Sequence, residues 1–289
     1  MLFVSSKDFL GPFRLVRMIR SGANVQIWEA RAEGEKESCA LKAIKIGQVK
    51  NKAEVEALKH EGAVGKTLKH PNVIKIYEYH SEFSQPFLHM ELFPAKNLKQ
   101  LIKDKHEAVK AHIDTIIRQC CESLIHLHSS GWIHCDVKPD NFLVSGKAEV
   151  KLIDFSIAKP VKQGFKLFGA KKIQGTRSYM APEQIRGKKV DARTDVYGLG
   201  CMMFEMVAGR PPFSGMNSDQ LLQKHLNSPP PTVKSANKRV RNEYSDLVGQ
   251  MLAKDPEKRP QTIEEVLRQV SKSKALKASA KPKTDKPPE

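Results

Sequence analysis

The segment His134-Cys135-Asp136-Val137-Lys138-Pro139-Asp140-Asn141, with Asp154-Phe155-Ser156 after a strand-like run, carries most of the information about this chain. It places a carboxylate, a lysine and an amide oxygen within six residues, and a second carboxylate follows eighteen residues after the first. Side chains of these types at this spacing point to one kind of chemistry.

Phosphoryl transfer needs three kinds of group. A carboxylate orients the attacking hydroxyl and accepts its proton, and Asp136 suits that task. Oxygen ligands hold Mg²⁺, a hard ion, against the phosphates, and Asn141 with Asp154 can supply them. A cation near the transferring group is provided by Lys138. A polar turn between two apolar segments is the alternative, and the combined match in type and spacing argues against it.

These two segments resemble the catalytic loop of eukaryotic-type protein kinases, H-R-D-x-K-x-x-N, and the D-F-G element that follows it. The resemblance extends over about residues 13–270. Lys138 and the Gly-Thr-x-x-Tyr pattern at 175–179 are typical of Ser/Thr kinases. The sequence around Asp195 is similar to that of bacterial members of the family. The implied α+β fold has two lobes: a small antiparallel β N-lobe with one key helix (about 13–92), a connection at 93–97, and a mostly α C-lobe (about 98–270).

The resemblance also implies an ATP site. Lys42, positioned by Glu61 on the first predicted helix, would hold the α- and β-phosphates. The backbone of the connection between the lobes would bond the adenine edge, and apolar residues would enclose the ring. The nucleotide-binding residues expected beyond that pair are Ile19, Gly22, Ile27, Ala40, Met90, Glu91, Phe93 and Leu143, with Ile153 beside them.

Four further residues are expected to support the site by the same resemblance. Thr176 would hydrogen-bond Asp136 and Lys138, Glu183 would pair with Arg259, and Asp195 would brace the catalytic loop.

The order of the expected elements agrees with such a fold. Alternation and turn residues predict strands at 14–19, 26–31, 39–46, 73–80 and 86–92. Helical spacing predicts helices at 52–68, 98–103 and about 108–128, and a buried helix at 196–209. That last run is too short to span a bilayer, and no signal peptide pattern opens the chain. We therefore expect a cytoplasmic protein without a transmembrane segment.

Net charge and cysteine content limit the classes of partner and ligand that we expect. The net charge of +17 among 289 residues suggests acidic partners, and a solvated basic surface explains the charge equally well. No nucleic-acid motif accompanies it. The odd number of cysteines, five, predicts reduced, core-filling thiols, and a metal cluster at His126, His128, His134 and Cys135 is the weaker alternative. Residues 271–289 are rich in Lys, Ala and Pro, so we expect a disordered basic tail.

Three features depart from the family pattern. Arg20, Gly22 and Val25 stand at the three positions of the glycine-rich loop, so a stiffer phosphate cover is expected. Ser156 replaces the glycine of D-F-G. Cys135 replaces an arginine that binds an activation-loop phosphate in the family, and residues 157–174 contain five lysines but no Ser, Thr or Tyr.

The expected function is transfer of the γ-phosphoryl of ATP, with Mg²⁺, to Ser or Thr hydroxyls of proteins. Acidic proteins are one class of substrate that would suit the basic chain. Two alternatives stay open: a pseudokinase-type binding or scaffold module on the same fold, favoured by the altered glycine loop, and a basic adaptor for nucleic acid or membranes. Substrate identity, upstream regulation and oligomeric state have no signature in the sequence.

Overall fold

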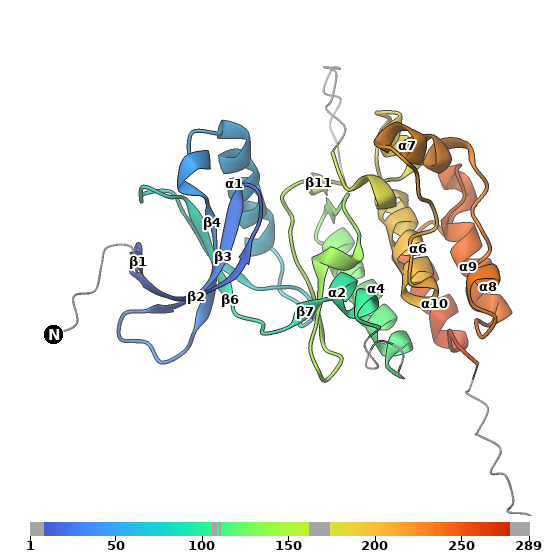
Figure 1. Cartoon of the computed structure of the whole chain (residues 1–289), viewed down its shortest axis with the longest axis horizontal. Helices are drawn as coiled ribbons and strands as arrows, with labels where there is room; N and C mark the ends of the chain where they lie inside the picture. The colour runs from blue at the N-terminus through green and yellow to red at the C-terminus, as the bar shows by residue number, and fades with distance from the viewer. Residues whose placement is uncertain (1–8, 106–108, 110, 162–173, 278–289) are drawn as a thin grey trace, which may run out of the picture.

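The computed structural model describes residues 9–105, 109, 111–161 and 174–277. It has two lobes joined by a single passage of chain between β6 and β7 (Figure 1). The expected α+β architecture is confirmed, because an antiparallel sheet with one long helix precedes a mostly helical lobe.

The N-lobe is a six-stranded antiparallel sheet in the order β1-β2-β3-β4-β6-β5. The helix α1 packs against β5, β4 and β6 on one side of it. Its elements are β1 Phe9–Leu10, β2 Phe13–Ser21, β3 Val25–Ala32, β4 Cys39–Ile44, η2 Ile46–Gln48, α1 Lys52–Lys66, β5 Ile76–His80 and β6 Phe87–Glu91.

The C-lobe begins with a small sheet and continues into helices. Its elements are β7 Lys96–Asn97, α2 Leu98–Lys103, α4 Ile113–Ser129, β8 Trp132–Ile133, η3 Pro139–Asn141, β9 Phe142–Val144, β10 Val150–Leu152, β11 Lys159–Pro160, η4 Arg177–Tyr179, α5 Pro182–Ile185, α6 Ala192–Ala208, α7 Ser218–Asn227, α8 Val233–Ala236, α9 Asn242–Met251, η5 Pro256–Lys258 and α10 Ile263–Lys272.

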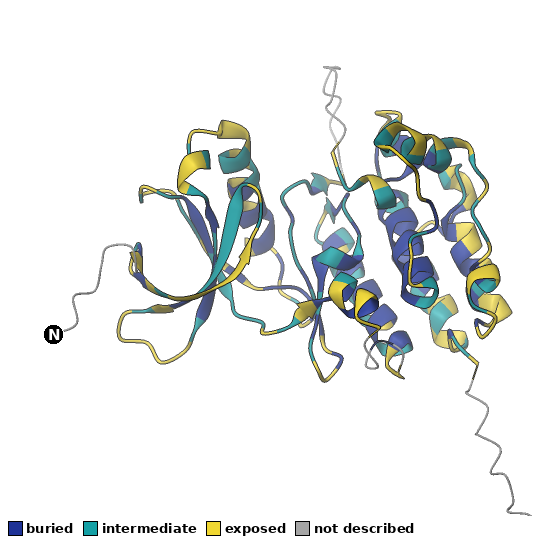
Figure 2. Ribbon diagram, viewed as in Figure 1, coloured by how far each residue is buried: buried dark blue, intermediate teal, exposed yellow. Residues whose placement is uncertain are grey.

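The C-lobe is built around α6, whose residues from Thr194 to Met206 are all buried (Figure 2). A helix that is apolar on every side can lie only inside a packed core. It ends at Gly209, which adopts φ 74° and caps the helix in the left-handed conformation. Within the described residues, no helix is both long and apolar enough to cross a membrane.

Several expected element boundaries differ from the structure. The predicted strand from 73 starts only at Ile76, because Val73 pairs with Leu152 of the C-lobe instead. The strand from 39 ends at Ile44, and Ile46, 82% exposed, opens a 3₁₀ turn. The helix expected over about 108–128 is interrupted by a bend at His112, after which α4 starts at Ile113; its expected start lies outside the described residues.

Expected disorder from residue 271 is also wrong for the first seven residues of the tail. Helix α10 runs to Lys272, Ala275 is buried, and Leu276 bridges to Val240. These apolar residues give the segment enough burial to order it. Residues 278–289 lie outside the described residues. The cysteine prediction is confirmed: all five are buried and unpaired.

Candidate active site

Strand β4 and helix α1 bring Lys42 and Glu61 together. The Lys42 Nζ lies 2.6 Å from Glu61 Oε2 and 3.5 Å from Asp154 Oδ1. Two glycines let α1 approach the sheet this closely. A Cβ on Gly62 would lie 2.8 Å from Leu88 Cδ2, and one on Gly65 would lie 2.3 Å from Ile76 Cδ1. The expected ion pair is therefore present.

Burial and charge set the protonation of this trio. Burial raises the pKa of Glu61 to about 7, and the charge of Lys42 offsets only part of the effect. For Asp154, burial acts to raise the pKa, but the Lys42 charge and a hydrogen bond from Ser156 overcome it and hold the pKa below its ordinary value. Burial lowers the pKa of Lys42, yet Asp154 and Glu61 together raise it above its usual range. Lys42 is thus cationic and Asp154 anionic.

Asp136 is held by three donors, two from the catalytic loop and one from Thr176. Its Oδ1 accepts the Thr176 backbone N–H at 2.8 Å, and its Oδ2 accepts Lys138 Nζ at 2.5 Å and Asn141 Nδ2 at 3.3 Å. Lys138 also donates to the Thr176 hydroxyl at 2.6 Å. Both contacts expected of Thr176 are confirmed. A carboxylate has about four acceptor sites, so Asp136 keeps room for a substrate hydroxyl.

A buried carboxylate fixes the backbone of this loop. Asp195 accepts the backbone N–H groups of His134 and Cys135, each at 2.8 Å, and His128 Nε2 lies 2.8 Å from the same side chain. Cys135 adopts φ 66°, a left-handed conformation that costs a non-glycine residue about 1–3 kcal/mol. The Asp195 bonds offset that strain, which confirms the bracing role expected of Asp195.

Asn141 and Asp154 offer oxygens to a divalent ion. Asn141 Nδ2 donates to the Asp136 carbonyl at 2.9 Å, which leaves the amide oxygen as the atom available to a cation. The Asn141 carbonyl accepts the Ile153 N–H at 3.0 Å, so the residue before Asp154 is tied to Asn141. Among the described residues, no group of three or more His, Cys, Asp or Glu could hold a metal alone. This donor set fits Mg²⁺ that completes its shell with phosphate oxygens and water.

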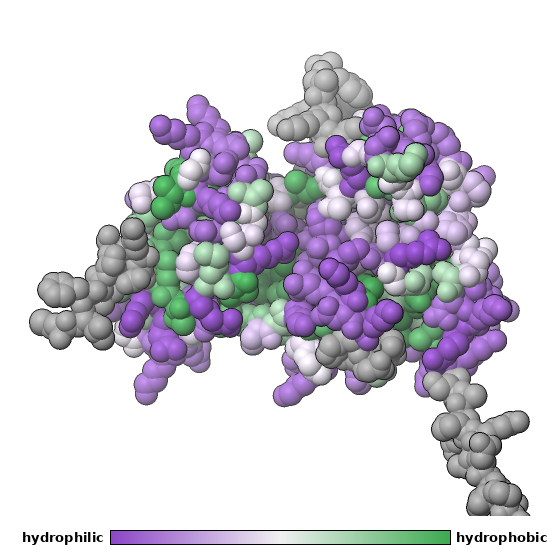
Figure 3. Space-filling view, in the orientation of Figure 1, coloured by the Kyte–Doolittle hydropathy of each residue, from purple (hydrophilic) through white to green (hydrophobic). Residues whose placement is uncertain are grey.

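The expected nucleotide-binding residues lie on strands of both lobes, in the β2–β3 turn and in the connection between the lobes. Ala40 pairs with Met90 across β4 and β6, and Ile27 pairs with Lys42 across β3 and β4. Leu143 lies on β9, beside Asn97 of β7. Glu91 closes β6, and Phe93 follows in the connection. Ile19 on β2 is 43% exposed, and apolar groups are visible at the surface where the lobes meet (Figure 3).

The end of β6 leaves limited backbone for an adenine. The Glu91 N–H donates to the Lys75 carbonyl at 2.9 Å. Its carboxylate accepts Lys151 Nζ and the Lys75 N–H, each at 2.8 Å. The Glu91 N–H is therefore not free to bond a ligand.

The altered glycine loop is a short turn between β2 and β3. Gly22 donates its N–H to the Val25 carbonyl at 2.9 Å, and Arg20 pairs with Ile27 in the strand ladder. Strand pairing therefore continues on both sides of the turn, and Arg20 is exposed at its edge.

The segment that follows the activation loop is anchored to the C-lobe core. Arg259 makes a two-pronged contact with Glu183, at 2.8 and 2.9 Å, and its side chain is fully buried. Thr194 donates to the same carboxylate at 2.9 Å. The predicted Glu183–Arg259 pair is confirmed. Of the lysine-rich loop at 157–174, residues 162–173 lie outside the described residues.

Two features of the site were missed at the sequence level. Glu205, buried on α6, accepts the Tyr179 hydroxyl at 2.6 Å and a bond from Lys99 on α2. His60, next to Glu61, contacts the Ala158 carbonyl at 2.8 Å. A charged residue inside the apolar run at 196–209 was a usable signal for Glu205, whereas nothing in the sequence marks a contact to a backbone carbonyl.

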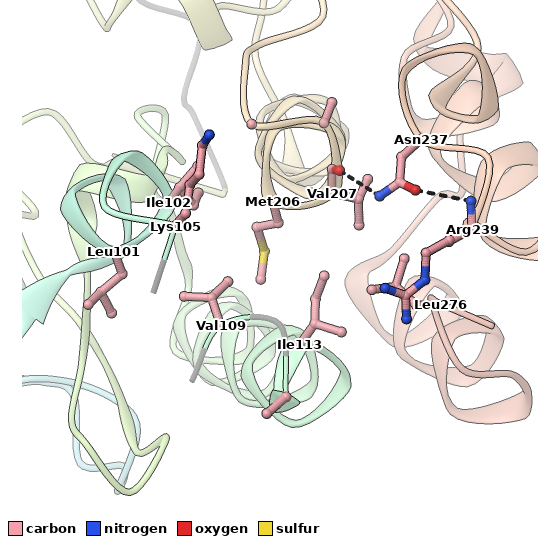
Figure 4. A pocket seen from close by; sticks show the side chains of 13 residues that line it. Leu101, Ile102, Lys105, Val109, Ile113, Met206, Val207, Asn237, Arg239 and Leu276 are labelled. Atoms are coloured by element: carbon pink, nitrogen blue, oxygen red, sulfur yellow. Dashed lines mark hydrogen bonds between the residues drawn. The ribbon is translucent and has the colours of Figure 1, made fainter. Parts of the chain in front are cut away.

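A separate cavity of about 520 Å³ lies in the C-lobe, between α2, α4 and the end of α6 (Figure 4). Apolar side chains such as Leu101, Ile113 and Met206 line it. None of the expected catalytic or nucleotide-binding residues borders it.

Fold and site together define a class of protein: a two-lobed phosphotransferase scaffold with its polar groups between the lobes. The family model described as "Protein kinase domain" matches residues 13–270, and this chain belongs to that family.

Three curated relatives of this chain are bacterial proteins. The chain is 30% identical over 262 residues to "Probable serine/threonine-protein kinase CPE1738" of Clostridium perfringens, covering 91% of this chain and 38% of that protein. It is 29% identical over 232 residues to "Serine/threonine-protein kinase PknB" of Mycobacterium tuberculosis, covering 78% and 37%. For "Serine/threonine-protein kinase PrkC" of Bacillus subtilis the identity is 26% over 260 residues, covering 90% and 40%. The chain thus spans less than half the length of these relatives.

Proposed function

We propose that this protein is a Ser/Thr protein kinase that transfers the γ-phosphoryl of ATP to protein hydroxyls. The observation that carries the proposal is the joint placement of Asp136, Lys138 and Thr176 in one hydrogen-bonded group, with Lys42 and Asp154 in contact nearby. The relatives named as Ser/Thr kinases support the same activity.

Each residue has a distinct task in this mechanism. Asp136 orients the acceptor hydroxyl and takes its proton, while Lys138 stabilises negative charge on the group in transit. Lys42, held by Glu61, binds the α- and β-phosphates. Asn141 and Asp154 hold Mg²⁺, which when bound neutralises charge on the phosphate oxygens.

The acceptor should be Ser or Thr, and acidic sequences should be preferred around it. Arg177, Arg186, Lys188 and Lys189 are exposed on or beside the segment that follows the activation loop. The net charge of +17 acts in the same direction. Charge attraction of this kind is screened by salt, so the preference should shrink as ionic strength rises.

A pseudokinase is the second candidate, because the β2–β3 turn keeps only Gly22 of three glycine positions. The Lys42–Glu61 pair and the anchored catalytic loop favour an active enzyme, since a scaffold has no need for either.

The purified chain should be incubated with γ-labelled ATP, Mg²⁺ and matched acidic and basic peptides that carry Ser, Thr or Tyr. We expect phosphoserine and phosphothreonine, with faster transfer to the acidic peptides at low salt. Nucleotide binding without transfer to any acceptor would favour the pseudokinase, and predominant phosphotyrosine would contradict the assignment of the acceptor.

A further inference from the structure

His60 joins the helix of the N-lobe to the activation segment of the C-lobe. It precedes Glu61 on α1, and its Nε2 lies 2.8 Å from the carbonyl oxygen of Ala158. A carbonyl oxygen only accepts, so Nε2 carries the proton and donates. Within the described residues, this is the side-chain hydrogen bond that connects α1 to the C-lobe.

Both partners of this bond are held in place. The His60 ring meets the Trp132 indole edge to face, with centroids 5.7 Å apart. Trp132 lies on β8, where it pairs with Pro160 of β11, two residues beyond Ala158. Ala158 is buried, and its N–H donates to the Phe155 carbonyl at 3.1 Å. The acceptor is therefore part of the turn at 155–158, which directly follows Asp154.

The contact lies where α1 would have to move. Glu61 reaches Lys42 only while α1 keeps its rotation about its own axis, and Lys42 also contacts Asp154. Since residues 60 and 61 share one helical turn, a rotation that withdraws Glu61 also displaces His60 from Ala158.

A phosphate cannot supply this link. Residues 157–174 contain no hydroxyl side chain, and position 135 is a buried Cys without a guanidinium. Activation-segment order that depends on a phosphate requires both a phosphorylated hydroxyl and a cationic receptor.

We infer that His60 is a positioning residue: its bond to Ala158 holds α1 and the turn at 155–158 together and keeps Glu61 on Lys42 without phosphorylation. The expected effect on the rate rests on the proposed kinase function. The link between α1 and the C-lobe rests on the geometry alone.

Three variants separate the donor from the ring. His60→Phe keeps the ring on Trp132 and removes the donor, His60→Gln restores a donor without the ring, and His112→Ala is a control at an exposed histidine. Loss of one hydrogen bond should lower kcat/KM for ATP about five- to tenfold in His60→Phe. His60→Gln should recover most of the rate, and the KM for peptide should stay unchanged in all three.

The route through Glu61 is tested by a double variant. In a Glu61→Gln background, His60→Phe should add no further loss of nucleotide affinity, because the two residues act on one contact. Equal and additive losses in both backgrounds would overturn the inference. So would a large fall in the rate of the wild-type protein after phosphatase treatment confirmed by intact mass.

Hydrogen exchange distinguishes failure of the inference from failure of the proposed function. Amides at 155–159 should exchange faster in His60→Phe than in wild type, and His60→Gln should restore the wild-type rate. If wild type transfers no phosphate, the kinase proposal fails, while faster exchange in His60→Phe still supports the link. Unchanged exchange overturns the link whether or not the protein is active.

Discussion

The catalytic loop and the β2–β3 turn are both expected to contact the triphosphate, but the protein holds them very differently. The loop is fixed from below by Asp195, which bonds two of its backbone N–H groups, and by Gln184, which donates to the Cys135 carbonyl at 2.8 Å. The turn is held by two backbone bonds, from the Gly22 N–H to the Val25 carbonyl and from the Lys45 N–H to the Asn24 carbonyl, and its residues are exposed or half-buried.

The difference indicates that the catalytic loop, rather than the β2–β3 turn, fixes the geometry of the reacting groups. Groups that act on the transferring phosphoryl must be preorganised, because misplacement of about 1 Å can cost about a hundredfold in rate. A cover that only closes over the phosphates tolerates substitution. This explains how the chain can keep Asp136, Asn141 and Asp154 while it has lost two of three loop glycines.

Asp154→Asn should produce the largest effect on the preorganised side. It removes the charge that binds Mg²⁺ and one anionic partner of Lys42. We expect transfer to fall by more than about a thousandfold, and the Mg²⁺-dependent part of nucleotide affinity to disappear. Initial rates and nucleotide titrations with and without Mg²⁺ provide the measurement. Asp246→Asn, an exposed carboxylate on α9, is the control and should match wild type. A Mg²⁺ response that survives Asp154→Asn would remove Asp154 from the metal site.

The free energy of unfolding should fall in acid, because the C-lobe contains a buried histidine. Burial, with the Lys254 charge, lowers the pKa of His225 to about 4, and Tyr197 meets its Nδ1 at 2.8 Å. In the unfolded chain the His225 ring is protonated near pH 6.5, whereas in the folded protein it stays neutral down to about pH 4. The free energy of unfolding therefore falls as the pH drops from about 6.5 to 4.

The size of that loss is measurable. Between pH 7 and 5 we expect wild type to lose about 2 kcal/mol more than His225→Asn, which lacks the titrating ring. Urea unfolding followed by tryptophan fluorescence gives both curves. Parallel pH dependence in the two proteins would show that His225 is not the group responsible.

Arg20→Ala should give the smallest effect, and it tests the β2–β3 turn rather than the catalytic loop. Arg20 is exposed on β2, just before the turn, where it pairs with Ile27 of β3. Surface charges of this kind contribute at most about 1 kcal/mol, so the KM for ATP should rise less than about fivefold. A rise above tenfold in steady-state assays would mean that Arg20 binds phosphate in place of the missing glycines.

Much of the site could be predicted from the sequence, because its motifs resemble those of a known family and the resemblance implies their contacts. The contacts Lys42–Glu61, Glu183–Arg259 and Asp195 to the catalytic loop are all found as expected. Alternation and helical spacing likewise give most of the elements, since they follow from local periodicity.

The rest depends on long-range partners that leave no local pattern. Val73 leaves the N-lobe sheet to pair with Leu152, and Leu276 orders the start of the tail by its bridge to Val240. The His60 bond ends on a backbone carbonyl, which every residue possesses.

The central claim is that Asp136 acts on the acceptor hydroxyl and not on the nucleotide. Single-turnover transfer and nucleotide affinity should therefore be measured side by side for wild type and Asp136→Asn. The account predicts that ATP affinity with Mg²⁺ stays within about twofold, while transfer falls about a hundredfold or more because the proton acceptor is lost. Equal transfer by the two proteins, or a loss of affinity that matches the loss of transfer, would contradict it.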